Sequence, residues 1–289
     1  MQKRPITLVA TSTRDFVLGS ERIGGPAFFA GIALHLLGAE AVILTVEGKA
    51  AGRLRRLPGI EVRAVKGREA IFSIDVDGRD RTLKALESPE LEPELPADCG
   101  GPYVISGTLG EISLELVERA ASRGTTIVDV QGFARALADG GRVVNSADRV
   151  REIMARLRGS GVILRGEKYE FPPECRGESI AECSERYRLD LIVTDSGDPF
   201  YAALGGHLYV GHPIQGLDGE PIGLGDVFTA ALCNYMCSEG MSIEESLARA
   251  SAAATLKMRD KQPWFTPLEV EEAARKVKVL REPAGQTQF

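Results

Sequence analysis

The segment Gly223-Leu224-Gly225-Asp226 stands at the start of a predicted helix, because apolar residues follow it at helical spacing. The first amides of a helix have no partner inside it, and the helix dipole favours an anion there. The glycines let the backbone approach a bulky anion closely. We therefore predict that the amides of Gly223, Leu224 and Gly225 form an anion hole. The carboxylate of Asp226 would be a base for a hydroxyl that attacks a phosphoryl group.

Other chemistry fits the same segment less well. An aspartate at a helix start also occurs as a plain cap or dipole partner, so this structural role stays open for Asp226. A Walker loop ends in Gly-Lys-Ser/Thr, and no such run occurs in the chain. A dinucleotide fingerprint needs a third glycine where this chain has Phe228. The expected anion loop is therefore of neither kind, which disfavours a nucleotide-dependent oxidoreductase.

The composition is that of an ordinary globular protein. The 289 residues are 44% hydrophobic and 26% charged, which is enough apolar sequence for a large core. A net charge of −6 argues against nucleic-acid binding by bulk electrostatics. No apolar run reaches membrane-spanning length, and the run from Ile6 to Ala10 is too short for a signal-peptide core. We therefore expect a cytoplasmic protein with no nucleic-acid or membrane partner.

The five cysteines and three histidines form no reactive motif. An odd number of cysteines without a secretion signal argues against a disulfide framework. Cys233 and Cys237 share a helix face and could pair on a metal, but packed thiols are the commoner explanation. No His-Glu-x-x-His and no Gly-x-Ser-x-Gly occurs, which disfavours a zinc protease and a serine hydrolase.

Short apolar runs alternate with helical patterns along most of the chain. The predicted strands are 7–10, 41–46, 103–106, 126–130, 143–145, 162–164 and 191–194. The predicted helices are 26–37, 112–123, 147–157, 178–188, 242–257 and 267–280, of which 242–257 begins with a capping box. This alternation predicts an α/β fold with a mostly parallel central sheet flanked by helices. Ligands bind such sheets beyond the carboxyl ends of the strands.

The stretch from about residue 60 to residue 87 has no helix signal. Apolar and polar residues alternate in 60–65 and 71–76, and Asp77-Gly78 between alternating runs indicates a hairpin. We therefore predict a small antiparallel sheet inserted at about 60–87, followed by a return linker at 88–96. A sheet of this size is marginal alone, so it must pack on something. It could cover a substrate cleft, pair with a second subunit to form a homodimer, or do both.

Four sequence elements in order resemble the ribokinase-like sugar kinases, the phosphofructokinase B family. The segment 223–228 resembles the family's Gly-Ala-Gly-Asp-Thr-Phe signature, and 23–38 resembles its amino-terminal Gly-Gly signature. Val144-Asn145-Ser146-Ala147-Asp148 is similar to its Asn-x-x-Glu element, with Asp in place of Glu. Val193-Thr194-Asp195-Ser196-Gly197 stands where the family has its Val-Thr-x-Gly nucleotide segment. The order and spacing agree along almost the whole chain, which implies one ribokinase-like domain over residues 1–289 with a β lid.

The resemblance implies roles for residues on the acceptor side. Asp15 stands where these enzymes place an acidic residue that accepts bonds from substrate hydroxyls, and Gly24 and Gly25 would complete this side of the cleft. Val128 to Arg135 is similar to the Asp-x-Gln-Gly-x-x-Arg segment of the inositol kinase branch of archaea and plants. Gln131 and Arg135 offer donors that suit a polyol. A turn cap for Gln131 and an acidic partner for Arg135 are the structural alternatives.

The resemblance also implies a donor site for ATP with Mg²⁺. Thr194, Gly197 and Ala253 would line the nucleotide. Asn145 and Asp148 would orient the water around a magnesium ion held mainly by phosphates, with a helix cap as their alternative role. Departures from the family pattern at Leu224, at Val227 and at residues 220–222 leave the phosphate donor open.

The sequence therefore predicts a kinase that transfers the γ-phosphate of ATP to a hydroxyl of a sugar or polyol, with myo-inositol as one candidate. A nucleoside kinase of the same fold would need an apolar slot for the base, which Phe16, Phe28 and Phe29 could supply. A non-catalytic sugar or nucleotide sensor is a third reading, but a sensor has no need of a base at position 226.

Overall fold

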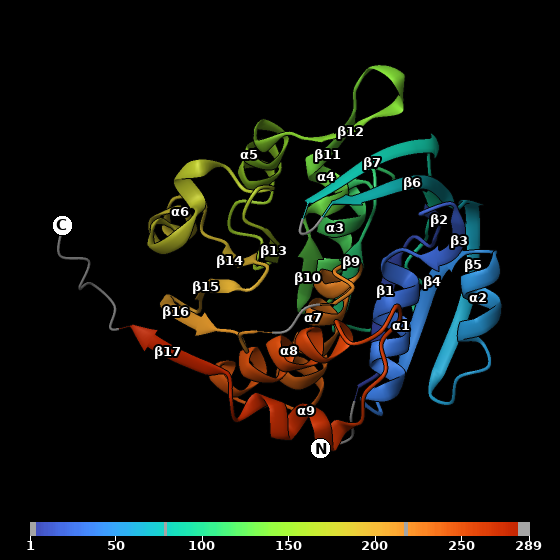
Figure 1. The fold of residues 1–289 in the computed structure, drawn as a ribbon. Coiled ribbons are helices and arrows are strands. Elements are labelled where there is room, and N and C mark those ends of the chain that lie inside the picture. Colours follow the sequence, from blue (N-terminus) through green and yellow to red (C-terminus); the bar gives the residue numbers. More distant parts are fainter. Residues whose placement is uncertain (1–3, 78–79, 217–218, 283–289) are drawn as a thin grey trace.

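A large mixed sheet forms the centre of the computed structural model, which describes residues 4–77, 80–216 and 219–282 (Figure 1). In the described residues its order is β17-β16-β15-β14-β13-β10-β9-β1-β4-β5-β8. The strands are β1 (Ile6–Ala10), β4 (Ala41–Val46), β5 (Ile60–Arg68), β8 (Glu90–Glu92), β9 (Tyr103–Ser106), β10 (Thr126–Asp129), β13 (Ile163–Glu167), β14 (Asp190–Asp195), β15 (Asp198–Leu204), β16 (His207–His212) and β17 (Lys278–Glu282). The run from β14 to β5 is parallel, and the strands outside it pair antiparallel. The predicted α/β class with a mostly parallel sheet is confirmed.

Helices cover both faces of this sheet and enclose two apolar cores. One face carries α1 (Pro26–Leu36), α2 (Lys49–Leu54), α7 (Leu224–Cys233), α8 (Ile243–Lys257) and α9 (Pro267–Ala274). The other face carries α3 (Leu114–Ala121), α5 (Ala147–Arg156) and α6 (Ile180–Tyr187). Shorter turns complete the helical elements: α4 (Gln131–Ala134), the 3₁₀ turns Asp139–Gly141, Pro173–Cys175 and Gly177–Ser179, and a π-helical turn Asn234–Ser238. No helix in the described parts of the chain is both long and apolar enough to cross a membrane.

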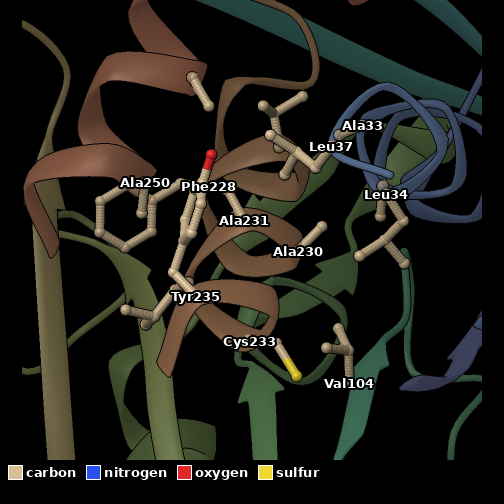
Figure 2. Packing of buried hydrophobic residues seen from close by; sticks show 14 of the residues in the cluster. Ala33, Leu34, Leu37, Val104, Phe228, Ala230, Ala231, Cys233, Tyr235 and Ala250 are labelled. Carbon is tan, nitrogen blue, oxygen red and sulfur yellow. The ribbon is translucent and has the colours of Figure 1, made fainter. Parts of the chain in front are cut away.

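The helix α7 is deeply packed. It lies between α1 and α8, and Figure 2 shows Ala230 and Ala231 between the side chains of these neighbours, with Cys233 directed towards Val104 of β9. Every residue of α7 from Val227 to Cys233 is buried. The start of α7 is therefore held in place by the core behind it.

A second, four-stranded sheet forms the lid. Its order is β3-β2-β6-β7, with β2 (Thr13–Val17), β3 (Ser20–Gly24), β6 (Ala70–Asp77) and β7 (Asp80–Glu87). Figure 1 shows it projecting over the carboxyl ends of the central strands. The predicted hairpin is present as the antiparallel pair of β6 and β7, although Gly78 of its turn lies outside the described residues. The lid also includes β2 and β3 within residues 13–24, which lie outside the predicted range of about 60–87.

Four further predictions differ from the structure. The strand at residue 60 belongs to the central sheet, since β5 pairs parallel with β4. Residues 143–145 form β12, which pairs with β11 (Arg135–Leu137) in a separate two-stranded sheet. The last predicted helix ends at Ala274, and part of the remainder forms β17. Cys175 and Cys183 are joined by a disulfide, which the odd cysteine count had argued against.

Candidate active site

Two adjoining pockets lie beyond the carboxyl ends of the parallel strands, where the α/β pattern predicts a ligand site. The first, here called the lid pocket, is lined by Asp15, Phe72, Ile74, Leu83, Arg135 and Ile222, among others. The second, here called the Arg165 pocket, is lined by Asp129, Arg165, Glu167, Thr194, Leu224 and Gly225, among others. Gln131, Gly223 and Asp226 line both pockets. A group bound in one pocket therefore meets a group bound in the other at these three residues.

The start of α7 forms the boundary between the two pockets. Gly223 is its N-cap, with a φ of 83° that favours glycine, and its carbonyl accepts the hydrogen bond of the Val227 amide (3.1 Å). The amides of Leu224 and Gly225 precede that first bond of the helix, so they point out of its N-terminus. A Cβ at Gly223 would overlap the ring of Phe29, and one at Gly225 would overlap the guanidinium of Arg165. Both glycines are therefore required by the packing around them.

Asp226 is the third residue of α7 and is half-buried. Its position places a carboxylate at the junction of the two pockets, beside the outward-facing amides. An anion in the Arg165 pocket and a hydroxyl in the lid pocket would both approach this side chain. The geometry therefore fits a base, the role that the sequence predicts for it.

Arg165 provides a buried positive charge directly against the anion loop. Its side chain is 4% exposed, and it donates to Asp129 Oδ2 (2.9 Å), Thr194 Oγ1 (2.6 Å) and Glu167 Oε1 (3.2 Å). Burial alone would lower its pKa, but the carboxylates of Asp129, Glu167 and Glu170 outweigh burial and raise it. Its Nε has no hydrogen-bond partner among the described residues. The Arg165 side chain lines the pocket, so its positive charge favours an anion bound there.

No motif marks Arg165, although the sequence carries a signal for it. Arg165 directly follows the apolar run 162–164, so a charged residue stands at the point where a buried strand reaches the ligand edge of the sheet. Glu170 is a second charged residue near this edge of the sheet. It follows the end of β13 by three residues and is buried. Burial and the nearby Asp129 carboxylate raise the pKa of Glu170 to about 7, and its Oε1 has no partner among the described residues.

Polar groups form one side of the lid pocket. Asp15 on β2 is buried and accepts a hydrogen bond from Thr13 Oγ1 (2.7 Å). Burial raises its pKa to about 6, against the opposing effects of the Thr13 hydrogen bond and of Arg135. Arg135 donates to Gln131 Oε1 (2.7 Å) and to the carbonyl of Thr108 (3.4 Å). A ligand with several hydroxyls would find both acceptors and donors on this side.

Two glycines leave the space that Asp15 and the neighbouring backbone occupy. A Cβ at Gly24 would overlap the carboxylate of Asp15, and one at Gly25 would overlap the backbone of Thr11 and Thr13. Gly25 also lines the lid pocket and has a φ of 83°. The predicted substrate-side residues Asp15, Gly24 and Gly25 are therefore neighbours in space.

Apolar side chains also line the lid pocket. Phe72, Ile74 and Leu83 come from the lid strands, and Phe29 and Ile222 come from the body of the protein. Of the aromatic residues considered for a nucleoside slot, only Phe29 lines this pocket. A compact ligand that offers both polar and apolar groups fits this mixed lining.

The predicted nucleotide-binding residues are separated in the structure. Thr194 lines the Arg165 pocket, and its hydroxyl accepts a hydrogen bond from Arg165. Gly197 does not line it, although the adjacent Ser196 and Asp198 do, and the Gly197 carbonyl accepts a bond from Gln215 Nε2 (2.6 Å). Ala253 faces the apolar core, because the helical turn directs Ala254 and Thr255 to the pocket in its place.

The predicted magnesium-orienting residues lie outside both pockets. Asn145 ends β12 and is exposed, and the Asp148 side chain is 82% exposed and pairs with Arg151. Position 148 is thus on the outer face of α5. Within the described part of the chain, no three His, Cys, Asp or Glu side chains are placed to hold a metal ion. Glu167, Asp195 and Asp198 line the Arg165 pocket, but Glu167 pairs with Arg165 and Asp195 pairs with Lys168. A magnesium ion in this pocket would therefore be held by phosphates and water rather than by a protein cage.

No family model matches the sequence, and no curated protein matches it. Solved structures do match the fold. A pyrophosphate-dependent kinase of the ribokinase family, complexed with a pyrophosphate analogue and myo-inositol, is 19% identical with a TM-score of 0.71, over 92% of this chain and 99% of the other.

Two further matches agree with it. A pyrophosphate-dependent myo-inositol-1 kinase that two substitutions convert into a myo-inositol-3 kinase is 18% identical with a TM-score of 0.72, over 94% and 99% of the two chains. A protein described as a possible 1-phosphofructokinase from Thermotoga maritima is 14% identical with a TM-score of 0.69, over 97% and 100% of the two chains. The chain therefore has the fold of the ribokinase-family sugar kinases.

Proposed function

We propose that this protein is a phosphotransferase that moves a phosphoryl group from a donor in the Arg165 pocket to a hydroxyl of a sugar or polyol in the lid pocket. The observation that carries the proposal is the position of Asp226 and Gly223 on both pockets. A base and an anion-binding helix start at one junction are the two parts that such a transfer needs. The shared fold of sugar and inositol kinases supports the same activity.

In this proposal the lid pocket binds the acceptor and the Arg165 pocket binds the donor. Asp15, Gln131 and Arg135 hold the acceptor by its hydroxyls, and the lid residues Phe72 and Ile74 exclude water from it. Asp226 takes the proton of the attacking hydroxyl. The amides at the start of α7 and the guanidinium of Arg165 stabilise the negative charge that develops on the transferred group. A magnesium ion, when bound, would neutralise further phosphate charge, with the carboxylates of the Arg165 pocket orienting its water.

We propose ATP with Mg²⁺ as the donor and myo-inositol as the first acceptor to test. A second donor, inorganic pyrophosphate, is favoured by one observation: Arg165 is a fixed cation packed against Gly225. Such a charge suits a small polyanion that brings no nucleoside with it. The pyrophosphate dependence of two of the matching kinases supports this candidate.

A matrix of donors and acceptors tests the proposal. The purified protein is incubated with ATP or pyrophosphate, each with Mg²⁺, and with myo-inositol, common sugars or nucleosides, and the phosphorylated product is detected by ³¹P NMR. We expect a phosphate monoester that requires both an acceptor and a donor and that is lost in Asp226→Ala. Product formed only with nucleosides would identify the nucleoside kinase, and ligand binding without any product would identify a sensor.

A further inference from the structure

Lys257 is a buried charge close to the proposed active site, to which the proposed mechanism assigns no role. It is the last residue of α8, and 0% of it is exposed. Its Nζ donates to the main-chain carbonyl of Glu220 (3.0 Å) and lies 5.4 Å from the centre of the Phe29 ring. A buried ammonium needs oxygens or a ring face around it to offset its lost hydration. The position at the carboxyl end of a helix also favours a cation.

The carbonyl that Lys257 binds belongs to the segment that leads into the anion loop. Glu220 precedes Gly223, the N-cap of α7, by three residues. The Glu220 amide donates to the carbonyl of Met258 (3.0 Å), so this residue is bonded to the end of α8 through both its amide and its carbonyl. The Lys257 ammonium therefore helps to hold the first residue of the segment 220–223 against the end of α8.

The same group also contacts the segment through an aromatic ring. Phe29, over whose ring the Lys257 ammonium lies, packs so closely against Gly223 that a Cβ there would overlap it. The carboxylate of Glu220 pairs with Arg22 of the lid strand β3 (2.8 Å). Lys257 is thus placed to fix both ends of the segment 220–223, and Glu220 links that segment to the lid.

We propose that Lys257 is a positioning residue that acts as a built-in monovalent cation. Its ammonium holds the Glu220 carbonyl and the Phe29 ring so that the amides at the start of α7 are already in place before a donor binds. A dissociable alkali or ammonium ion can occupy the same kind of carbonyl site, but here the charge is attached to the chain. This inference rests on the proposed function for its kinetic test and not for its structural test.

The kinetic test uses Lys257→Ala, with Lys276→Ala on the exposed surface as the matched control. We expect Lys257→Ala to lose about 10- to 100-fold in kcat/KM for the donor, because a small displacement of catalytic groups has costs of that order. Methylamine or ammonium should restore most of that loss, since either can enter the space left by the side chain. Lys257→Met, which fills that space with apolar atoms, should lose activity without being rescued.

The structural test does not need any activity. The unfolding temperature of Lys257→Ala should rise on addition of methylamine, whereas that of the unchanged protein and of Lys276→Ala should not. The unchanged protein should also work equally well in sodium, potassium and tetramethylammonium salts. A strong dependence of the unchanged protein on one alkali ion, or a Lys257→Ala variant that amines neither stabilise nor reactivate, would overturn the proposal. If the unchanged protein transfers no phosphate, the proposed function fails, and the unfolding measurement still decides the role of Lys257.

Discussion

Asp226 stands where the two pockets meet, and its proposed role can be separated from the folding of α7. Asp226→Asn preserves the size of the side chain, and asparagine is also favourable near the start of a helix. The substitution removes the proton acceptor. We expect kcat to fall by about 10²- to 10⁴-fold, with the acceptor KM and the unfolding temperature little changed. Steady-state kinetics and thermal unfolding measure these quantities.

The matched control for this substitution is Asp148→Asn. Asp148 is on the outer face of α5, outside both pockets, so this variant should keep the unchanged protein's kcat. Near-normal turnover in Asp226→Asn would show that the aspartate is not the base and only complements the helix dipole. A large loss in Asp148→Asn would restore the magnesium role that its exposed position argues against.

Asp15 should make acceptor binding depend on pH. Burial raises its pKa from 3.8 to about 6, so the carboxylate is mostly ionised at neutral pH and becomes protonated as the pH falls through 6. The proposed acceptor hydroxyls donate to the ionised form. The acceptor KM should therefore rise by about tenfold at one pH unit below this pKa. An acceptor without its own titration in this range, such as myo-inositol, gives the clearest measurement.

Asp15→Asn should bind the acceptor weakly at every pH and should lose this dependence of KM. A change confined to kcat would assign the titration to another group and would contradict the role of Asp15.

Site residues such as Asp15 could be predicted from the sequence where a motif marks them. Arg165 and Glu170 could not be predicted from a motif, because their importance comes from burial against Asp129, which is distant in the sequence.

At the scale of the element, the start of α7 depends on two glycines that leave room for neighbouring side chains. Gly225→Ala should displace the Arg165 guanidinium or the helix start, since the new methyl group overlaps Nη1. We expect a loss of about 10²-fold in kcat/KM for the donor, with a smaller effect on the acceptor KM. Gly52→Ala in α2 is the control, because a Cβ there meets nothing within 4 Å.

The control variant Gly52→Ala should keep full activity. Its free energy of unfolding should rise by up to about 1 kcal/mol, because alanine restricts the unfolded chain and favours a helix. Full activity in Gly225→Ala would mean that the contact between the loop and Arg165 has no part in donor binding. Equal losses in both variants would point to a general intolerance of helix substitutions instead.

Local elements were predictable where the sequence signal is local. The ranges 41–46 and 103–106 agree with β4 and β9, because short apolar runs between turns encode buried strands. The strand at 60 was assigned to the wrong sheet, since alternation shows that one face is polar but not which strand is the partner. For β17 the helical pattern of 267–280 competed with pairing to β16, a long-range contact that no local signal reveals.

At the scale of the whole molecule, the site exists because the lid stands over the strand ends of the central sheet. The class of fold followed from the alternation of strands and helices, and the order of four weak motifs indicated the same family of folds that the structural comparison found. The pairing of β2 and β3 with the hairpin could not be predicted, because residues 13–24 are distant from it in sequence. Dimer formation through the lid and a cytoplasmic location stay predictions.

The lid should open and close more readily than the central sheet unfolds. Among the side chains that the structure describes, its own apolar cluster has Val17, Ala70, Phe72 and Ile74 as buried members, whereas the two cores beside the central sheet are much larger. Local opening is easiest where few apolar contacts hold a segment. Amides of β6 and β7 should therefore exchange with solvent hydrogen faster than those of β9 and β10 in the free protein. Mass-spectrometric hydrogen exchange measures this difference.

A bound acceptor should slow hydrogen exchange in the lid alone. Phe72, Ile74 and Leu83 line the pocket that the acceptor fills, so binding adds contacts that opening would have to break. With the acceptor present, exchange in β6 and β7 should slow, while β9 and β10 stay unchanged and Asp15→Asn shows a weaker response. Exchange in the free lid as slow as in β9, or no slowing with a saturating acceptor, would mean that the lid is a fixed wall and that substrates enter by another route.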